Sequence, residues 1–171
     1  ATPLRAYEQG IKLSRYAFNI NHAAHESRSS NLNLSLGDFS DGNQRLEAGL
    51  SHRFAIKRSA KHLVYARLGL GWQGNDKINT NYFNPSALTT LSSGIDYTGT
   101  LHRHYSEYFK HRVSVDLNLQ KQAGFGGGVV PGISYLHLWQ LNKRLNGSYG
   151  ISFSKPIFDG SRENSLSYFA Q

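Results

Sequence analysis

The stretch that decides the fold is YFKHRVSVDLNLQK, residues 108–121. From Phe109 to Leu119 the side chains alternate, with apolar residues and one histidine on one side and polar or charged residues on the other. A period of two residues predicts a β-strand with one apolar and one polar face. The strand is about ten residues long, which is the length that crosses a bilayer when a strand tilts by roughly 45°. We therefore expect a membrane-spanning strand here.

Other parts of the chain repeat this pattern. The remaining expected strands span residues 10–22, 30–37, 45–57, 62–73, 88–104, 133–141, 145–154 and 164–171. In the first of them the apolar positions change phase after Leu13, so we expect a bulge near Ser14 and Arg15. No helical pattern separates the strands, which predicts an antiparallel all-β fold, either a barrel or a β-sandwich.

The connections favour the barrel. Short turns are expected at 23–29, 58–61, 105–107 and 142–144, and longer loops at 38–44, 74–87, 121–128 and 155–163. Strict alternation of short and long connections is typical of outer-membrane barrels, whose short turns are periplasmic and whose long loops are extracellular. Aromatic residues near strand ends predict interfacial girdles; they are Tyr16, Trp72, Tyr105, Tyr108 and Trp139. The prediction is an antiparallel transmembrane β-barrel of the outer membrane.

The number of strands suggests that the chain is part of a larger barrel. Bacterial barrels have an even number of strands and begin and end in the periplasm. Nine strands that end in the periplasm would begin on the outer side, so we expect further strands before Ala1. The last strand, which stops at Gln171, is about three to five residues short of a full span. Residues 1–171 are thus expected to be the C-terminal part of a barrel domain, truncated at the N-terminal side and at the last strand.

The composition limits the chemistry. The 171 residues include no cysteine, which excludes disulfides and thiolate metal sites. The net charge is +8, but lysine and arginine are scattered, with Lys57-Arg58 and Lys143-Arg144 as the longest runs. This favours solvated loops and lumen charges over a nucleic-acid patch. A mean hydropathy of −0.49 agrees with a barrel, because each strand pairs its apolar face with a polar one.

None of the motifs in the sequence predicts a cofactor or metal site. GLGWQG at 69–74 matches G-x-G-x-x-G, but no helical pattern follows it. His102 and His104 share a strand face, yet no carboxylate follows at a spacing that would complete a metal site. DFSDGN at 38–43 begins like a calcium loop, but the twelfth position is Gly49 instead of glutamate. We expect no cofactor and no metal.

The polar strand faces are the candidate functional surface. In a barrel they would line the lumen, and the residues expected to line the pore are Glu47, Arg53, Tyr65, Arg67, Asp96, Thr98, Thr100, Arg112, Asp116 and Asn118. Two alternatives remain open. One is a barrel enzyme that acts on lipid through Ser51 and His52 or Ser134 and His137, although one sequence cannot reveal a Ser-His-acid arrangement. The other is a soluble β-sandwich that binds sugar.

Six segments carry a family resemblance. They are TPLRA (2–6), ESRS (26–29), DFSDGN (38–43), YFNP (82–85), HRHYSEYFKHR (102–112) and YLHLWQLNKRLNGSYGISFSKPIFDGSRE (135–163). Together they resemble the C-terminal barrel of the PgaA/HmsH family, outer-membrane porins that export poly-β-1,6-N-acetyl-D-glucosamine. The likeness covers nearly the whole chain, and DFSDGN and the last loop are its most specific parts.

The resemblance implies a passive conduit and no catalysis. It implies a barrel of about sixteen strands, preceded by a periplasmic helical-repeat region through which a deacetylase would be a partner. The other expected partners are the exopolysaccharide and outer-membrane lipid, and no nucleic acid. If the polymer is partly deacetylated, Glu47, Asp96 and Asp116 would attract its ammonium groups.

The chain departs from the family in two respects. It ends at Gln171, where the family ends on an aromatic residue, and it is basic, whereas the family's pore is thought of as acidic.

Overall fold

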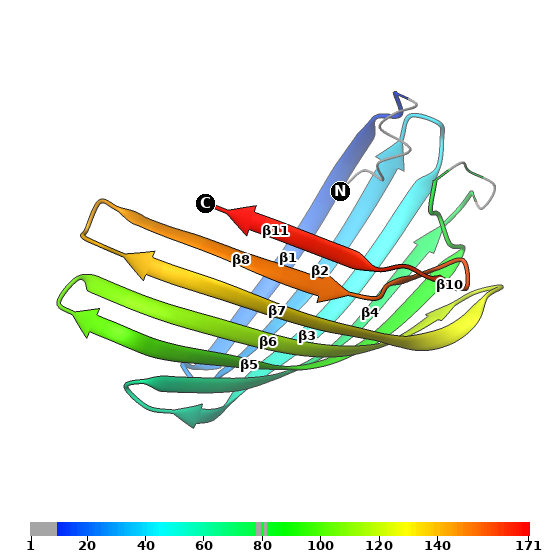
Figure 1. Cartoon of the computed structure of the whole chain (residues 1–171). Helices are drawn as coiled ribbons and strands as arrows, with labels where there is room; N and C mark the ends of the chain where they lie inside the picture. Colours follow the sequence, from blue (N-terminus) through cyan, green and yellow to red (C-terminus); the bar gives the residue numbers. More distant parts are fainter. Residues whose placement is uncertain (1–9, 78–79, 81) are drawn as a thin grey trace.

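The computed structural model describes residues 10–77, 80 and 82–171 (Figure 1). Nine long strands follow the chain: β1 (Leu13–His25), β2 (Arg28–Phe39), β3 (Gln44–Arg58), β4 (His62–Asn75), β5 (Ala87–His104), β6 (Glu107–Gln122), β7 (Gly126–Gln140), β8 (Asn146–Ser154) and β11 (Ser165–Ala170). Two short strands, β9 (Ile157–Phe158) and β10 (Ser161–Arg162), lie in the last connection. The nine expected strands are confirmed. None of the described residues belongs to a helix long and apolar enough to cross a membrane.

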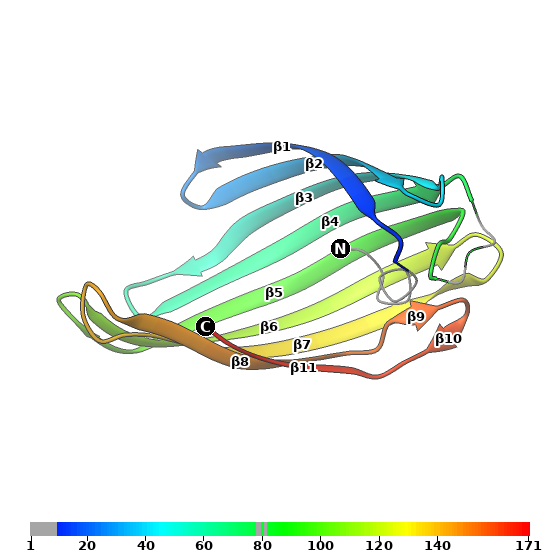
Figure 2. The same ribbon diagram turned by 90° about the horizontal axis from the view of Figure 1, so that it is seen from above.

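The long strands form a single antiparallel sheet in the order β1-β2-β3-β4-β5-β6-β7-β8-β11. The sheet curves into a trough, in which β1–β4 cross behind β5–β11 (Figures 1 and 2). β1 and β11 are its two edges, and no pairing within the described residues joins them. A β-sandwich divides its strands between two stacked sheets, so the β-sandwich alternative is wrong.

The expected bulge at Ser14 and Arg15 is also wrong. The register between β1 and β2 is continuous from Leu13 opposite Phe39 to His22 opposite Ser30, and it becomes irregular only between His22 and His25. Ile11 and Leu13 are out of phase with the later apolar residues for another reason. They pack against the buried rings of Phe39 and Tyr82 at the end of the sheet.

Connection lengths differ between the two ends of the sheet. Residues 26–27, 59–61, 105–106 and 141–145 connect strands at one end, which we call the short-turn end. Residues 40–43, 76–86, 123–125 and 155–164 connect them at the other, the long-loop end. The two longest connections share the long-loop end, but strict alternation is wrong. The expected loop at 121–128 is only a turn at 123–125, which is shorter than 141–145.

The loop was expected to extend to residue 128 because glycines usually indicate a loop. The glycines at 126–128 belong instead to β7. Gly127 and Gly128 pair with Lys121 and Gln120 in the ladder. A Cβ atom on Gly127 would lie 2.9 Å from the backbone oxygen of Gln120, and one on Gly128 would collide with Ile157. Gly128 therefore makes room for β9 over the sheet, Gly127 allows close approach to the β6 backbone, and neither belongs to a flexible loop.

The hairpin of β9 and β10 lies where a plain loop was expected. Asp159 and Gly160 form its two-residue turn with φ of 49° and 79°, the left-handed geometry that two-residue hairpins require. Gln122 holds the turn, because its side-chain nitrogen donates to Asp159 Oδ1 at 2.6 Å and its oxygen accepts from the Asp159 backbone N–H at 3.2 Å. Phe158 packs edge-on against Phe83, with ring centroids 5.0 Å apart.

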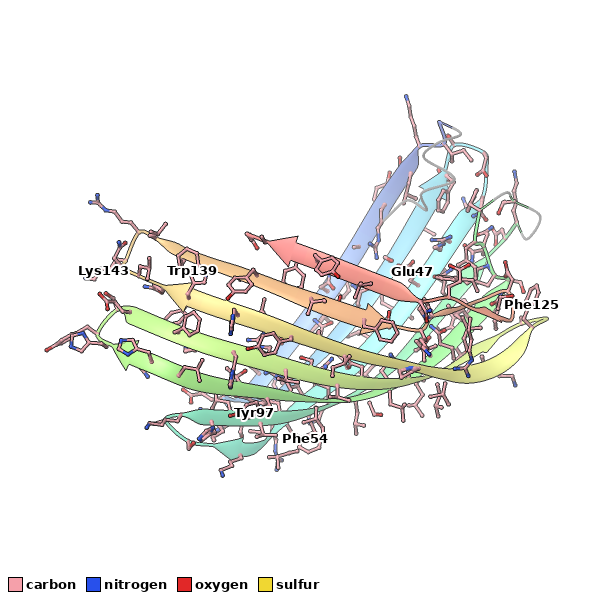
Figure 3. All side chains as sticks on the ribbon, viewed as in Figure 1. Glu47, Phe54, Tyr97, Phe125, Trp139 and Lys143 are labelled. Atoms are coloured by element: carbon pink, nitrogen blue, oxygen red, sulfur yellow. The ribbon has the colours of Figure 1, made fainter. Side chains whose placement is uncertain are left out.

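The two faces of the sheet have opposite character. Large apolar side chains on the convex face are exposed, for example Leu50 at 54% and Val115 at 52%. Polar side chains on the concave face are buried, including Ser35 at 4% and Asp96 at 8%. Glu47 lies on the concave side, and Phe54 and Tyr97 lie on the opposite side (Figure 3). Large exposed apolar surfaces mark sites of protein or membrane contact.

Candidate functional site

The ten residues predicted to line a pore share the concave face. Their strand pairings place them on one set of alternate positions; for example, Tyr65 lies opposite Asp96, Arg53 opposite Arg67, and Thr98 opposite Arg112. Most of them also contact one another. The structure therefore brings them to one surface, which is what the strand period alone predicts.

Asp96 is the centre of the largest polar cluster. Its Oδ2 atom lies 2.7 Å from Arg67 Nε and 3.9 Å from Arg53 Nε. Ser114 Oγ donates a hydrogen bond to Asp96 Oδ1 at 2.6 Å. The guanidinium of Arg53 also stacks over the ring of Tyr65, with its Cζ atom 3.7 Å from the ring centroid. Asp96 thus holds two cations across three strands.

Arg67 extends the cluster to Asp116 across an intervening strand. Arg67 Nη2 donates to Asp116 Oδ1 at 2.9 Å. Gly94 lies between them in the register, opposite Arg67 on one side and Asp116 on the other. A Cβ atom on Gly94 would lie 2.6 Å from Asp116 Oδ1 and 3.1 Å from Arg67 Nη2. The ion pair therefore requires a glycine at this position.

Glu47 belongs to a second cluster nearer the long-loop end. Arg15 Nη2 donates to Glu47 Oε2 at 2.8 Å and to Ser35 Oγ at 3.1 Å. Ser35 Oγ donates to the same Glu47 oxygen at 2.8 Å. The sequence analysis missed Arg15 and Ser35. Arg15 was lost because the bulge wrongly expected beside it disturbed the phase of β1.

The other predicted residues lie outside these clusters. Arg112 Nε donates a long hydrogen bond of 3.4 Å to Thr98 Oγ1. Thr100 lies opposite Lys110, and Asn118 lies opposite Ser92. All three predicted acids, Glu47, Asp96 and Asp116, therefore contact an arginine, so the face presents compensated charge rather than free carboxylates.

A hollow of about 490 Å³ lies on the concave face between the two clusters. Along β3, Glu47 precedes it, and Gly49, Ser51 and Arg53 line it. Neutral amides and hydroxyls form much of its lining; they include Asn21, Asn31, Asn33, Ser51, Thr90 and Ser92. Arg53, Arg67 and Asp116 of the first cluster line its border. The hollow therefore offers mainly uncharged hydrogen-bond donors and acceptors beside a group of paired charges.

Glycines deepen the hollow without a structural need of their own. Nothing lies within 4 Å of a Cβ atom built on Gly49, and for Gly71 the nearest atom is 3.9 Å away. Gly49 and Gly71 lie opposite each other in the register. Glycine in a strand is less stable than alanine by roughly 0.5–1 kcal/mol, and in strands it often marks a close approach by a ligand.

A buried cluster at the long-loop end joins the two motifs DFSDGN and YFNP. The rings of Phe39 and Tyr82 stack with centroids 5.6 Å apart. Asn43 is fully buried, and its side-chain nitrogen donates to the Tyr82 hydroxyl at 3.2 Å and to Asn84 Oδ1 at 3.1 Å. Arg45 also donates to Asn84 Oδ1, at 3.2 Å. The turn at 40–43 thus holds part of the 76–86 loop in place.

Tyr82 also anchors this loop through Asp41. The Tyr82 hydroxyl donates to Asp41 Oδ2 at 2.9 Å. Burial and this hydrogen bond raise the pKa of the Tyr82 hydroxyl above its usual value. Gly42 follows Asp41 with φ of +81°, as the Asp-Gly turn signal predicts. DFSDGN is therefore a structural tie between two loops.

Every histidine lies in the half of the sheet nearer the short-turn end, and their strand pairings place them on the convex face. They are His22, His25, His52, His62, His102, His104, His111 and His137. Within the described residues, no group of three or more histidine, aspartate or glutamate side chains is placed to hold a metal ion. These histidines are instead accompanied by tyrosines.

Three histidines and three tyrosines form a row across β4–β8, which we call the His–Tyr belt. Its members are His62, Tyr97, His111, Tyr135, His137 and Tyr149. His62 Nδ1 and the Tyr97 hydroxyl are 2.9 Å apart, and His137 bonds to the hydroxyls of Tyr135 and Tyr149 at 2.8 and 2.5 Å. The centroid of the His111 ring lies 5.6 Å from that of Tyr97 and 6.4 Å from that of Tyr135. The sequence did not reveal the belt, because it depends on the register between five strands.

The predicted aromatic girdles are only partly confirmed. Trp72 and Trp139 lie on the convex face near opposite ends of the sheet, and Tyr16 lies on the convex face of β1. Tyr108 lies opposite Arg103 and Gln140 on the concave face, so its assignment to a girdle is wrong. Tyr105 is in the turn at 105–106, 92% exposed and with a positive φ.

The two serine–histidine pairs considered for catalysis are not formed. Ser51 and His52 are adjacent in β3 and therefore point to opposite faces. Ser134 and His137 are three positions apart in β7 and also lie on opposite faces. His52 instead bonds to Ser30 Oγ at 2.9 Å.

The two ends of the sheet also differ in charge. Among the described residues, the short-turn end carries Arg28, Lys57, Arg58, Lys61, Arg103, Lys110, Lys143 and Arg144 against only Glu26 and Glu107. The long-loop end carries Lys12, Arg45, Lys77, Lys121, Lys155 and Arg162 against Asp38, Asp41, Asp76, Asp159 and Glu163. The excess of positive charge is therefore concentrated at the short-turn end.

Comparison with known proteins identifies a membrane barrel. The family model described as "PgaA membrane beta barrel domain" matches residues 1–170. The chain is 25% identical over 164 residues to proteins named "Poly-beta-1,6-N-acetyl-D-glucosamine export protein" from Escherichia coli K12 and from Escherichia coli O157:H7. Each alignment covers 96% of this chain but 20% of the relative, so the chain spans about a fifth of the length of these relatives.

A solved structure confirms the fold. The chain superposes on a "Bacterial polysaccharide outer membrane secretin" with a TM-score of 0.93 and 24% identity. The match covers 98% of this chain and 57% of that one. The curved nine-stranded sheet therefore has the fold of part of a membrane β-barrel, as the strand period predicted.

Proposed function

Because this chain belongs to the family of PgaA membrane β-barrel domains, we propose that it forms part of the wall of a channel that exports poly-β-1,6-N-acetyl-D-glucosamine across the outer membrane. The observation that carries the proposal is the inversion of the sheet. Exposed apolar side chains cover its convex face, and polar side chains, several of them buried, cover its concave face. Such a wall fits lipid on one side and a hydrated polymer on the other. The name of the Escherichia coli relatives supports the choice of polymer.

The proposal requires a closed barrel. In a bilayer, each backbone N–H and C=O must be paired within the protein, so an open sheet edge is excluded from the hydrocarbon region. β1 and β11 each pair along one side only. We propose that further strands join these two edges into a barrel of about sixteen strands, an even number as bacterial barrels require.

The polymer would contact the concave face through neutral groups more than through charge. Glu47, Asp96 and Asp116 each contact an arginine, which weakens their attraction for free ammonium groups. The hollow between the clusters offers amides and hydroxyls that match the acetamido and hydroxyl groups of the sugar. The ten predicted residues would surround this hollow and supply many weak contacts, as a moving chain requires.

In this proposal the barrel is a passive conduit, and it makes or breaks no covalent bond. Polymer synthesis at the inner membrane would supply the driving force. A periplasmic deacetylase is a proposed partner, which would act through a helical-repeat region outside this chain. Outer-membrane lipid would contact the convex face.

Complementation tests the function. Cells that synthesise the polymer but lack their own export protein should regain surface polymer when they express the full-length protein that contains this chain. Detection with a polymer-specific lectin or antibody measures it. Polymer that stays in the periplasm, although the barrel is folded in the outer membrane, would overturn the proposal.

A second experiment tests the hollow. Replacing both glycines, Gly49→Val with Gly71→Val, narrows the hollow at two positions where an added Cβ atom meets no close neighbour, and should lower export severalfold. Gly132→Val is the matched control, because Gly132 lies on the concave face outside the hollow and a Cβ atom there is 3.6 Å from the nearest atom. Equal export by both variants would exclude the hollow from the polymer's path.

A further inference from the structure

The short-turn end of the convex face carries two layers of polar groups. The outer layer consists of exposed cations in the turns, including Lys61, Lys143 and Arg144. Lys143 extends away from the end of the sheet (Figure 3). The inner layer is the His–Tyr belt. His137 lies four residues before the turn at 141–145, which is about 13 Å along a strand that rises roughly 3.3 Å per residue.

This spacing matches the edge of a membrane. The interfacial layer on each side of the hydrocarbon is about 5–8 Å thick, and strand tilt shortens the distance between belt and turns along the membrane normal. The cations would lie at the level of the headgroups, and the belt at the boundary with the hydrocarbon. Tyrosine and histidine suit that boundary, because each has an apolar body and a polar tip.

The positive charge of the short-turn end favours lipids with anionic headgroups. This end carries eight lysine and arginine side chains and two carboxylates, whereas the long-loop end is nearly balanced. Arg103 and Lys110 lie on the concave face, opposite Tyr108 and Thr100, and the turn cations lie at the edge of the sheet. Arg58 neutralises Glu26 at 2.6 Å. Lys61, Lys143 and Arg144 form none of the ion pairs found among the described residues. The excess positive charge complements a net negative surface.

The belt supplies hydrogen bonds beside these cations. The histidines fix the hydroxyls of Tyr97, Tyr135 and Tyr149 in a row on the lipid-facing side of the sheet. In each of these bonds one partner donates its proton; where the imidazole N–H donates, the tyrosine O–H is left to donate to a phosphate oxygen. Cations in the turns and hydrogen-bonding groups at the next depth therefore form a surface for phosphodiester groups.

We propose that this end of the barrel binds anionic phospholipids, through a headgroup phosphate held between the turn cations and the His–Tyr belt. The short turns face the periplasm, so the lipids belong to the periplasmic leaflet. This surface is independent of the polymer and lies on the opposite face of the sheet. It would orient the barrel and select its surrounding lipid.

Lipid enrichment tests the proposal. The full-length protein is reconstituted into vesicles with equal amounts of phosphatidylglycerol and phosphatidylcholine, and the lipids retained on it are counted by native mass spectrometry. We expect at least threefold enrichment of phosphatidylglycerol. The triple variant Lys61→Gln, Lys143→Gln, Arg144→Gln should lose most of it, and Tyr97→Phe with Tyr149→Phe should lose part.

A matched control separates a local surface from total charge. The variant Lys12→Gln, Lys121→Gln, Lys155→Gln removes the same charge from the long-loop end and should keep the enrichment. No enrichment by the unsubstituted protein, or equal loss in both triple variants, would overturn the proposal. If the first triple variant fails to fold, the salt dependence of the unsubstituted protein decides. Enrichment that persists in high salt would contradict binding by these cations.

Discussion

The convex and concave faces of one sheet solve opposite problems with the same strands. On the convex face, the middle of the sheet carries exposed aliphatic side chains such as Leu50, Leu117 and Ile133. On the concave face, four of the five ion pairs found among the described residues cross between strands, and Ser114 adds a hydrogen bond to Asp96. The difference shows that the medium on each side of the sheet, and not strand propensity, determines whether a position carries an apolar or a polar residue.

The largest expected effect comes from a charge on the wrong face. Leu117→Arg puts a cation on the convex face and should lower the free energy of unfolding from lipid vesicles by about 2–4 kcal/mol. Asn118→Arg, one residue away on the concave face, should change it by less than about 1 kcal/mol. Urea titration in vesicles measures both. Equal losses would break the distinction between the faces.

Removing the central acid of the concave face should cost less. Asp96→Asn leaves Arg53 and Arg67 without their shared carboxylate and should destabilise the barrel by about 1–3 kcal/mol. Asp116→Asn removes a more exposed carboxylate and should have a smaller effect. The same titration compares the two. A larger loss for Asp116→Asn would mean that Asp96 is not the centre of the cluster.

The loop tie should contribute still less. Tyr82→Phe removes the hydroxyl that bonds Asp41 and Asn43, at an expected cost of about 1 kcal/mol. Limited proteolysis should then cut the 76–86 loop faster. Unchanged cleavage would show that the hydroxyl does not hold the loop.

Alkaline pH tests the same hydroxyl. The pKa of Tyr82 is raised in the folded protein, so its contribution to stability is present below the unfolded pKa, about 10, and is lost as pH rises through the folded pKa. Protection of the loop from protease should decline above pH ~10 in the unsubstituted protein. Tyr82→Phe should show a smaller decline, and an identical decline would contradict the assignment.

The smallest effect is expected outside both faces. Glu26 and Arg58 form an exposed ion pair at the short-turn end, and the hydrogen bond and charge of Arg58 lower the pKa of Glu26. That contribution is present above the unfolded pKa and is lost as pH falls through the folded one. Glu26→Gln should leave the urea midpoint at pH 7 unchanged, because exposed pairs are screened by water. A clear shift would show that this pair is not solvated.

The apolar and polar faces of β3–β6 could be predicted from the sequence, because successive residues of a strand point to opposite faces and each face selects residues that suit its surroundings. The place of all ten residues on the concave face follows from that rule, and no knowledge of neighbouring strands was needed. The resemblance to known porins added the proposed polymer.

What the sequence could not reveal depends on contacts between distant residues. Arg15 joins Glu47 only when the register of β1–β3 is known. Gly128 pairs with Gln120 in the ladder, and it is a glycine because Ile157 packs over it. The His–Tyr belt needs five aligned strands. The local residue pattern therefore does not predict structure at the ends of the sheet, or contacts between side chains of different strands, because packing between distant residues decides both.

The most direct test of the two faces uses single cysteines, since the chain has none of its own. Arg112→Cys, Val115→Cys, Leu117→Cys and Asn118→Cys are placed one at a time in β6 of the full-length protein in vesicles and treated with a water-soluble maleimide. Positions 112 and 118 should react, and positions 115 and 117 should stay unlabelled within the bilayer. Labelling of 115 and 117 at the rate of 118 would contradict a lipid-facing apolar row and with it the channel wall.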